Sequence, residues 1–304
     1  MSPSSAATLL PLGELDAPAP SPGAPVRPSS VLWLVARQEL LLAVRSRWTL
    51  IFAIVFAALS LGVATSGYIL SGGSGFQDFS RTSASLVQLV VLVVPLASLL
   101  MGVLALSPER GTAELLFSQP VSRTSILLGQ MLGLFGALAA AQLVGFGLAG
   151  AVVFANVGEE GGLGYAVMVL ASLGLTAAFL SIAAWLAAGA IGRKRTRALA
   201  LALVLWFASV ILLDLATLGV ASLLPSGAAS RVLIGSVILN PVGAVRTGAL
   251  LGIEGTAAFG SASLALLRFT HGPVGAAFIL CASVLAWVVV PALLAARRLR
   301  RTDL

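Results

Sequence analysis

Side chains that can carry out catalysis or hold a metal are scarce in this sequence. It has one histidine, His271, and one cysteine, Cys281, which can form no disulfide within the chain. No nucleophile is paired with a base at catalytic spacing, and the Gly-x-x-x-x-Gly-Lys-Ser/Thr loop that cradles nucleotide phosphates does not occur. The sequence therefore predicts no catalytic residue, no metal site and no capacity to hydrolyse a nucleotide.

One polar stretch, residues 107–123, has residue types in an interpretable order. It reads Ser-Pro-Glu-Arg-Gly-Thr-Ala-Glu-Leu-Leu-Phe-Ser-Gln-Pro-Val-Ser-Arg. Pro108 can start a helix and Pro120 can end it, while Glu109 and Glu114 lie toward the positive N-terminal end. The stretch therefore predicts a short helix over residues 107–121.

The same predicted helix has an apolar edge formed by Leu115, Leu116 and Phe117. An apolar edge beside charged groups suits a helix that docks into a groove on a soluble partner. Membrane topology accounts for basic residues in a cytoplasmic loop but not for the acidic Glu109 and Glu114. Their presence therefore favours a docking helix over a merely solvated loop. Ser122 follows and is expected to cap the next helix.

A second polar candidate is Asp214, which lies inside a long apolar run. It is ~24 Å by helical rise from the start of that run. A carboxylate within a membrane is a functional candidate by default, and Arg231 or Arg246 can pair with it. Asp214, Asn240 and Arg246 are therefore predicted to form a polar site in the membrane or at its outer face; the alternative is a hydrated Asp214 at the interface.

The composition indicates the kind of fold that holds these polar side chains in place. Hydrophobic residues make up 59% of the 304 residues and charged residues only 10%, which is more apolar surface than a soluble chain can cover. The basic residues lie at the ends of apolar runs and are not interleaved with aromatics on a soluble face, which argues against nucleic acid as a partner. The chain is therefore expected to be an all-α polytopic membrane protein.

Six apolar runs are long enough to cross the ~30 Å hydrocarbon core. Pro95 and Pro291 fall inside two of them and are expected to kink the helix without ending it. The six predicted spans are residues 48–69, 86–106, 126–154, 165–191, 198–224 and 273–296.

Three segments lie outside these spans. Residues 1–28 are rich in Pro, Ser and Ala and predict a disordered tail with no signal peptide. Residues 29–47 predict an amphipathic helix lying on the inner leaflet. Residues 225–272 contain two short apolar pieces, which we interpret as a re-entrant region in the outer half of the membrane, with a pair of extra spans as the alternative.

The distribution of basic residues gives the orientation. Of the 18 Lys and Arg residues, four lie on one side of the predicted spans and the other 14 on the opposite side. Since basic residues favour the cytoplasmic side, both termini are expected to be cytoplasmic. The four residues on the outer side are Arg81, Arg231, Arg246 and Arg268.

These motifs carry a family resemblance. The pattern E-R-G-T-x-E-x-L-x-x-Q-P-V-S-R, which begins at Glu109, resembles the coupling segment of ABC-2 type exporter permeases, and most of all that of the NosY-like permeases of nitrous oxide reductase maturation. Arg37-x-Glu39-Leu40 with Arg45-Ser46-Arg47 is similar to the family's N-terminal interfacial helix. Leu239-Asn240-Pro241 followed by Arg246 is similar to the element before its last span. The chain has Gln130 where a Lys is common.

The resemblance implies a type V exporter fold, a homodimer of permeases in the bacterial inner membrane, and separate cytoplasmic ATPase subunits that bind ATP and Mg. It further implies a periplasmic accessory protein.

The basic cluster of residues 193–197 is interpreted as a lipid anchor, with a second ATPase contact as the alternative. The implied ATPase-coupling residues are Glu109, Arg110, Gly111, Thr112, Glu114, Leu115, Leu116, Phe117 and Arg123, joined by Arg37, Glu39, Arg45 and Arg47 of the interfacial helix.

Copper is the metal of the enzyme that the NosY-like resemblance suggests. Copper(I) conduction needs thioether, thiolate or imidazole ligands along a pore, and no two such side chains lie at ligand spacing here. The expected role is export of a sulfur species or transmission of a shape change to a periplasmic partner. Three alternatives remain: another ABC-2 exporter for drugs, lipids or motility, an ATP-independent secondary carrier, and an intramembrane enzyme. The residues tested as ligands are Met101, Met131, Met168, His271 and Cys281.

Overall fold

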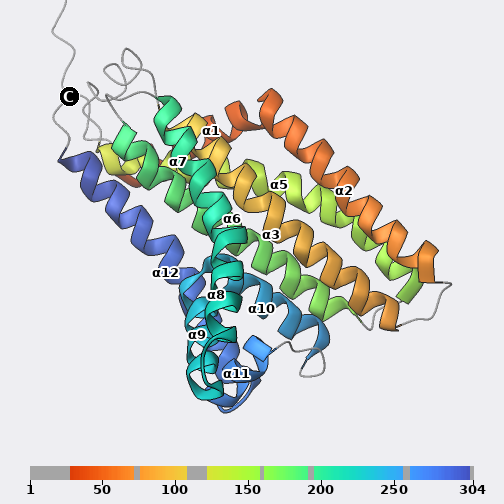
Figure 1. The fold of residues 1–304 in the computed structure, drawn as a ribbon. Helices are drawn as coiled ribbons and strands as arrows, with labels where there is room; N and C mark the ends of the chain where they lie inside the picture. The colour runs from red at the N-terminus through yellow and green to blue at the C-terminus, as the bar shows by residue number, and fades with distance from the viewer. Residues whose placement is uncertain are drawn as a thin grey trace, which may run out of the picture.

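The computed structural model describes residues 28–71, 76–107, 122–157, 161–190, 195–255 and 261–301, and all regular structure in these ranges is helical (Figure 1). Six of the described helical segments are long and apolar enough to cross a membrane, which confirms the predicted class. The helices are α1 (Pro28–Val44), α2 (Arg47–Ser71), α3 (Phe76–Leu106), α5 (Arg123–Val157), α6 (Gly162–Ala190), α7 (Arg195–Phe207), η1 (Ala208–Leu212), α8 (Leu213–Ser222), α9 (Ser226–Leu239), α10 (Pro241–Glu254), α11 (Ser261–Phe269) and α12 (Pro273–Arg300).

The spanning helices are longer than the apolar runs that reveal them. α3 begins at Phe76, ten residues before the predicted start at residue 86. α5 has 35 residues, or ~52 Å at 1.5 Å per residue, against a hydrocarbon core of ~30 Å. Backbone hydrogen bonding continues a helix past the point where its side chains stop being apolar, so hydropathy locates the spans but underestimates their length.

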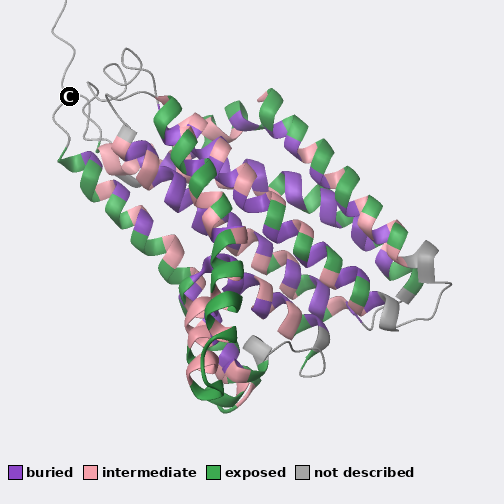
Figure 2. Ribbon diagram, viewed as in Figure 1, coloured by how far each residue is buried: buried purple, intermediate pink, exposed green. Residues whose placement is uncertain are grey.

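α6 lies at the centre of the bundle and packs against α3, α5, α7, α10 and α12. Its second half is buried on all sides, from Ala178 to Ala184. A helix that is apolar all round lies in a protein core or in lipid, and the burial of this stretch places it in the core. By contrast, the most apolar windows of α2, of the α7–α8 span and of α12 are only 17–22% buried, so these helices form the outside of the bundle (Figure 2).

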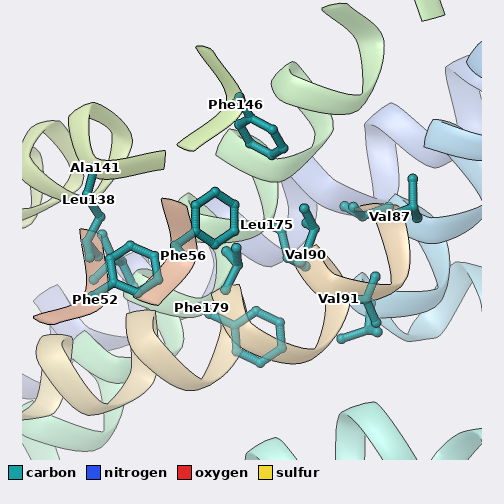
Figure 3. Packing of buried hydrophobic residues seen from close by; sticks show 14 of the residues in the cluster. Phe52, Phe56, Val87, Val90, Val91, Leu138, Ala141, Phe146, Leu175 and Phe179 are labelled. Carbon is teal, nitrogen blue, oxygen red and sulfur yellow. The ribbon is translucent and has the colours of Figure 1, made fainter. Parts of the chain in front are cut away.

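Aromatic rings join α2 to this core. Phe56 is fully buried, and its ring lies 5.2 Å from that of Phe146 of α5 in an edge-to-face arrangement. Phe52 lies one turn earlier on α2, beside Leu138 and Ala141 of α5 (Figure 3). The geometry suits the charge distribution of the rings and fixes the register of α2 against α5.

The span from α7 to α8 is interrupted by one π-helical turn, η1, where the Leu213 amide donates to the Ala208 carbonyl oxygen. Such turns inside α-helices shift the following side chains around the axis, and they occur often at functional sites. Here η1 sits where α9 and α10 meet.

α9 and α10 form a bent pair with an angle of 98° at Asn240. α9 packs back along α8, and the last turn of α10 lies beside the first turn of α6, where the backbone of Gly252 and Ile253 approaches Gly164. The end of α8 and the start of α6 are at one end of the bundle, so the pair enters and leaves at that end. The bent pair is compatible with a broken span as well as with a re-entrant region, so the re-entrant interpretation stays a prediction.

Candidate functional site

The predicted coupling segment connects α3 to α5. Residues 108–121 lie outside the described residues, whereas Ser107 and Ser122 on its two sides are described. Ser122 caps α5 as predicted, because its Oγ accepts a hydrogen bond of 3.1 Å from the Ser125 amide. The predicted contact residues that fall in the undescribed segment are Glu109, Arg110, Gly111, Thr112, Glu114, Leu115, Leu116 and Phe117.

Arginines bond each of the two helices beside this segment to another helix of the bundle. Arg123, the first residue of α5, donates from Nη1 to the Leu299 carbonyl oxygen of α12 at 3.4 Å. In return, Arg300 of α12 donates from Nε to the Thr124 hydroxyl at 3.1 Å. Arg123 was predicted as a contact for a partner, and the structure places it in the joint between α5 and α12.

A third arginine anchors the other side of the segment. Arg195, the first residue of α7, donates from Nη2 to the Leu104 carbonyl oxygen near the end of α3. The starts of α5 and α7 are therefore bonded to the ends of α12 and α3, respectively. This end of the bundle, which also carries α1 and the end of α12 in Figure 1, is called the arginine end below.

The other predicted contacts lie in α1 (Arg37 and Glu39), in the turn after it (Arg45) and at the start of α2 (Arg47). Arg37, Arg45 and Arg47 are exposed, so their guanidinium groups are accessible to a partner. Glu39 is half-buried against α5, and burial raises the pKa of its carboxyl above the ordinary 4.5. The three arginines are therefore surface groups, whereas Glu39 is part of the contact between α1 and α5.

Glycines on α5 let α1 approach closely. A Cβ added at Gly129 would lie 2.8 Å from the Leu32 carbonyl oxygen, and one added at Gly133 would lie 2.7 Å from the Glu39 Cβ and 2.8 Å from the Leu40 amide nitrogen. α1 therefore runs beside the first half of α5 in the same chain direction. The Gly-x-x-x-Gly spacing is a known signal for close helix packing, and it is legible in the sequence although the interpretation above did not use it.

Near the middle of the bundle, Asn240 organises the corner between α9 and α10. Its Oδ1 accepts from the Val242 amide at 3.1 Å, capping α10, and its Nδ2 donates to the Ser209 carbonyl oxygen of η1 at 2.7 Å. On the other flank, the Ser283 hydroxyl of α12 donates to the Ile238 carbonyl oxygen at 2.5 Å. The corner is thus held by both of the last two spans.

Asp214 pairs with Arg246, one of the two arginines considered for it. The Arg246 Nη1 lies 2.5 Å from the Asp214 Oδ2, and their side chains are 26% and 35% exposed. Asp214 is in the first turn of α8 and Arg246 is in the middle of α10. The Asn240 bond to Ser209 and the ion pair therefore hold α10 against the same span, within its π-helical turn and just after it.

The interpretation of the sequence missed a buried polar cluster between α5 and α6. Gln142, which is fully buried, donates from Nε2 to the Thr176 hydroxyl at 2.7 Å and accepts at Oε1 from the Ser172 hydroxyl at 2.6 Å. Interhelical bonds of this kind hold membrane helices together. The signal available in the sequence was one amide in the middle of a long apolar run.

Comparisons with known proteins agree with the motifs. A family model described as ABC-2 family transporter protein matches residues 33–304. A probable ABC transporter permease protein NosY of Stutzerimonas stutzeri is 36% identical over 276 residues, covering 89% of this chain and 98% of that protein. A probable ABC transporter permease protein NosY of Pseudomonas aeruginosa is 36% identical over 241 residues, covering 77% of this chain and 87% of that protein.

Proposed function

The chain belongs to the ABC-2 family of transporter proteins, as a non-catalytic, multi-pass permease subunit, and from this membership we propose that it supports copper-site assembly of nitrous oxide reductase. The observation that carries the proposal is the similarity to NosY permeases along nearly the whole of both chains. The proposed task is either the export of a sulfur species or the transmission of a shape change to a periplasmic accessory protein.

The positions of the thioether side chains favour these tasks over copper conduction. Met101 and Met168 are buried in the apolar core of the bundle, at 8% and 1% exposure. Copper(I) conduction needs ligands exposed along a pore, whereas both side chains are packed among apolar neighbours. Packing accounts for both residues.

Energy enters, in this proposal, at the arginine end. A separate cytoplasmic ATPase binds ATP and Mg and pushes on residues 107–121. A second contact is made by the exposed arginines Arg37 of α1, Arg45 and Arg47. Arg123 passes the movement from α5 to α12, and Arg195 couples α3 to α7. The proposal includes a second permease copy, both termini in the cytoplasm, and the bacterial inner membrane.

Charge supports this orientation. Arg123, Arg195, Arg298 and Arg300 gather at the arginine end, where helices α3 and α6 finish and α5 and α7 begin. Basic groups concentrate on the cytoplasmic side of membrane proteins, and there they also contact anionic lipids.

The coupling role is tested by co-purification with the partner ATPase. Glu114→Lys combined with Leu116→Asp is expected to abolish ATPase binding and permease-stimulated ATP hydrolysis, because it reverses one charge and removes the apolar edge. A matched control is Arg231→Glu, a charge reversal at an exposed site at the opposite end. Retention of both activities by the double variant, with the control equally active, makes the coupling role wrong.

The copper-enzyme role is tested in a host that makes nitrous oxide reductase. Deletion of the gene for this chain is expected to yield reductase that lacks its full copper sites, with the intact gene restoring them. A deletion strain with fully loaded reductase contradicts the role and favours another ABC-2 exporter. Transport that follows an ion gradient with no ATPase present favours a secondary carrier.

A further inference from the structure

A groove of ≈ 390 Å³ lies against α6 between α5 and α12, in the half of the bundle near the arginine end. Its floor includes Leu180 of α6, and its walls include Phe135 of α5 and Val288 of α12. All of its lining residues except Thr124 and Ser181 are apolar. The volume falls within the ~300–1,000 Å³ range of ligand pockets, yet no role assigned above uses this groove.

The groove is about as long as one membrane leaflet is deep. It extends over residues 124–135 of α5, ~16 Å at 1.5 Å per residue, and over residues 288–296 of α12, ~12 Å. Half of a hydrocarbon core of ~30 Å is ~15 Å. Leu132 and Leu293 line the groove and are 47% and 52% exposed, so its open side is apolar and lies on the outside of the bundle.

Positive charge lies at one end of this apolar groove. On α12 the groove residues continue at helical spacing from Ala296 to Arg300, whose Nε donates to the Thr124 hydroxyl. Within the described ranges the Nη1 and Nη2 groups of Arg300 make no hydrogen bond or ion pair, so they are available to an anion. The N-terminal end of α5 is positive as well, and the arginines in the last turn of α12, Arg297, Arg298 and Arg300, outweigh the negative end of that helix.

A basic end joined to an apolar groove fits an amphiphile with an anionic head. A guanidinium binds phosphate oxygens through paired N–H donors, and basic pockets between spanning helices bind the headgroups of anionic lipids. A hydrocarbon chain fits the rest of the groove, because it supplies the dispersion contacts that the lining side chains otherwise lack. A soluble anion uses only the first part, and an uncharged hydrocarbon uses only the second.

Charge also argues against a second copy of the chain as the occupant. Two copies in one membrane that are related by a twofold axis along the membrane normal meet with residues of the same depth facing each other. Apart from Glu39, which packs against α5, the charged side chains described at the arginine end are arginines. A second copy over the groove therefore brings arginines against Arg300, and like charges that face each other across an interface are unfavourable.

We propose that this groove binds an anionic phospholipid, with the phosphate on Arg300 and one acyl chain along α6 between α5 and α12. The lipid belongs to the cytoplasmic leaflet under the orientation proposed above, and the inference rests on the proposed function in that respect alone. The bound chain lies beside the bonds that join Arg123 to Leu299 and Arg300 to Thr124. It therefore fills the space between α5 and α12 where the proposed movement passes from one helix to the other.

The test is native mass spectrometry of the detergent-solubilised full chain, with phosphatidylglycerol and phosphatidylethanolamine as probes. The wild type is expected to bind the anionic lipid more tightly than the zwitterionic one. Arg300→Gln is expected to weaken phosphatidylglycerol binding about tenfold, since a charge-assisted hydrogen bond is lost, and Arg300→Lys is expected to restore part of it. Arg301→Gln removes the same charge from the next residue and is expected to bind like the wild type. Thr124→Val removes the Arg300 bond but keeps the guanidinium, and it is expected to retain the lipid.

A second set of variants tests the acyl chain. Ala292→Phe places a ring in the groove, whereas Ala282→Phe adds the same ring to α12 at an exposed site that does not line the groove. Ala282→Phe is expected to retain the phosphatidylglycerol adduct, and Ala292→Phe is expected to lose it. Leu128→Trp, from the opposite wall, is expected to lose the adduct as well and serves if Ala292→Phe does not fold.

Three results overturn the proposal. One is equal lipid retention by the groove-filling variants and Ala282→Phe, and another is equal binding of the two lipids by the wild type or of phosphatidylglycerol by Arg300→Gln and Arg301→Gln. The third is an efficient disulfide between two copies through Leu293→Cys in a Cys281→Ser background, since a second copy then covers the groove. None of these measurements involves the ATPase or nitrous oxide reductase, so failure of this inference is distinct from failure of the proposed function.

Discussion

The close approach of α1 to α5 gives a prediction that depends on a single methyl group. Gly133→Ala puts a Cβ 2.7 Å from the Glu39 Cβ and 2.8 Å from the Leu40 amide nitrogen. One of these contacts is with backbone, so the collision is relieved only when α1 moves away from α5. Overpacking of this kind costs about 1–3 kcal/mol. The better helix propensity of alanine returns up to about 1 kcal/mol, which leaves a net loss of about 0–2 kcal/mol.

Gly147→Ala is the matched control, because it is the same substitution in the same helix. A Cβ at Gly147 has nothing within 4 Å, so only the propensity gain of up to about 1 kcal/mol remains. Equilibrium unfolding in mixed micelles is expected to separate the two variants by about 1–3 kcal/mol, with Gly133→Ala the less stable. Equal stability of the two variants refutes the described packing of α1 on α5.

Three further predictions concern single interactions. Asp214→Asn and Arg246→Gln are each expected to cost about 1–3 kcal/mol in the same unfolding assay, less than a fully buried pair because both side chains are partly exposed, and the double variant is expected to cost less than the sum. Gln142→Leu is expected to cost about 1–2 kcal/mol, since the Thr176 hydroxyl loses its buried donor; stability equal to the wild type contradicts the cluster. Burial raises the pKa of Glu39, so the folded chain holds its proton to higher pH than the unfolded chain, and stability falls as pH rises from about 4.5 through the raised pKa. Glu39→Gln is therefore expected to be more stable than the wild type near pH 7 and to lose that advantage below pH 4.5; an advantage independent of pH contradicts the burial of the carboxylate.

Hydropathy predicted the number and the place of the spans because burial in hydrocarbon selects for apolar side chains over the whole crossing. It did not predict where helices end. The first ten residues of α3, from Phe76, include Gln, Asp and Arg, and nothing in their polarity separates a helix from a loop. Local capping was more readable: Ser122 was predicted as a cap from its own chemistry, and it is one.

Pairing between distant residues was harder to obtain from the sequence. Asp214 had two candidate arginines, and the choice of Arg246 depends on the π-helical turn η1, which reorients Asp214, and on the 98° bend after α9. The π-helical turn has no signal in the sequence, whereas Asn240-Pro241 marks the place of the bend but not its angle. The interfacial helix was expected to lie on the leaflet, whereas its detailed contact with Gly129 and Gly133 depends on the register of two helices.

The central claim is that residues 107–121 receive the movement of a cytoplasmic ATPase. The most direct test is photo-crosslinking in membranes that contain both subunits, with a photoreactive amino acid at Leu116 or, as the control, at Leu223 beyond the end of α8. The account predicts ATPase crosslinks from position 116 and none from position 223. ATPase crosslinks from position 223 contradict it. So does the absence of crosslinks from position 116 in a complex that still shows permease-stimulated ATP hydrolysis.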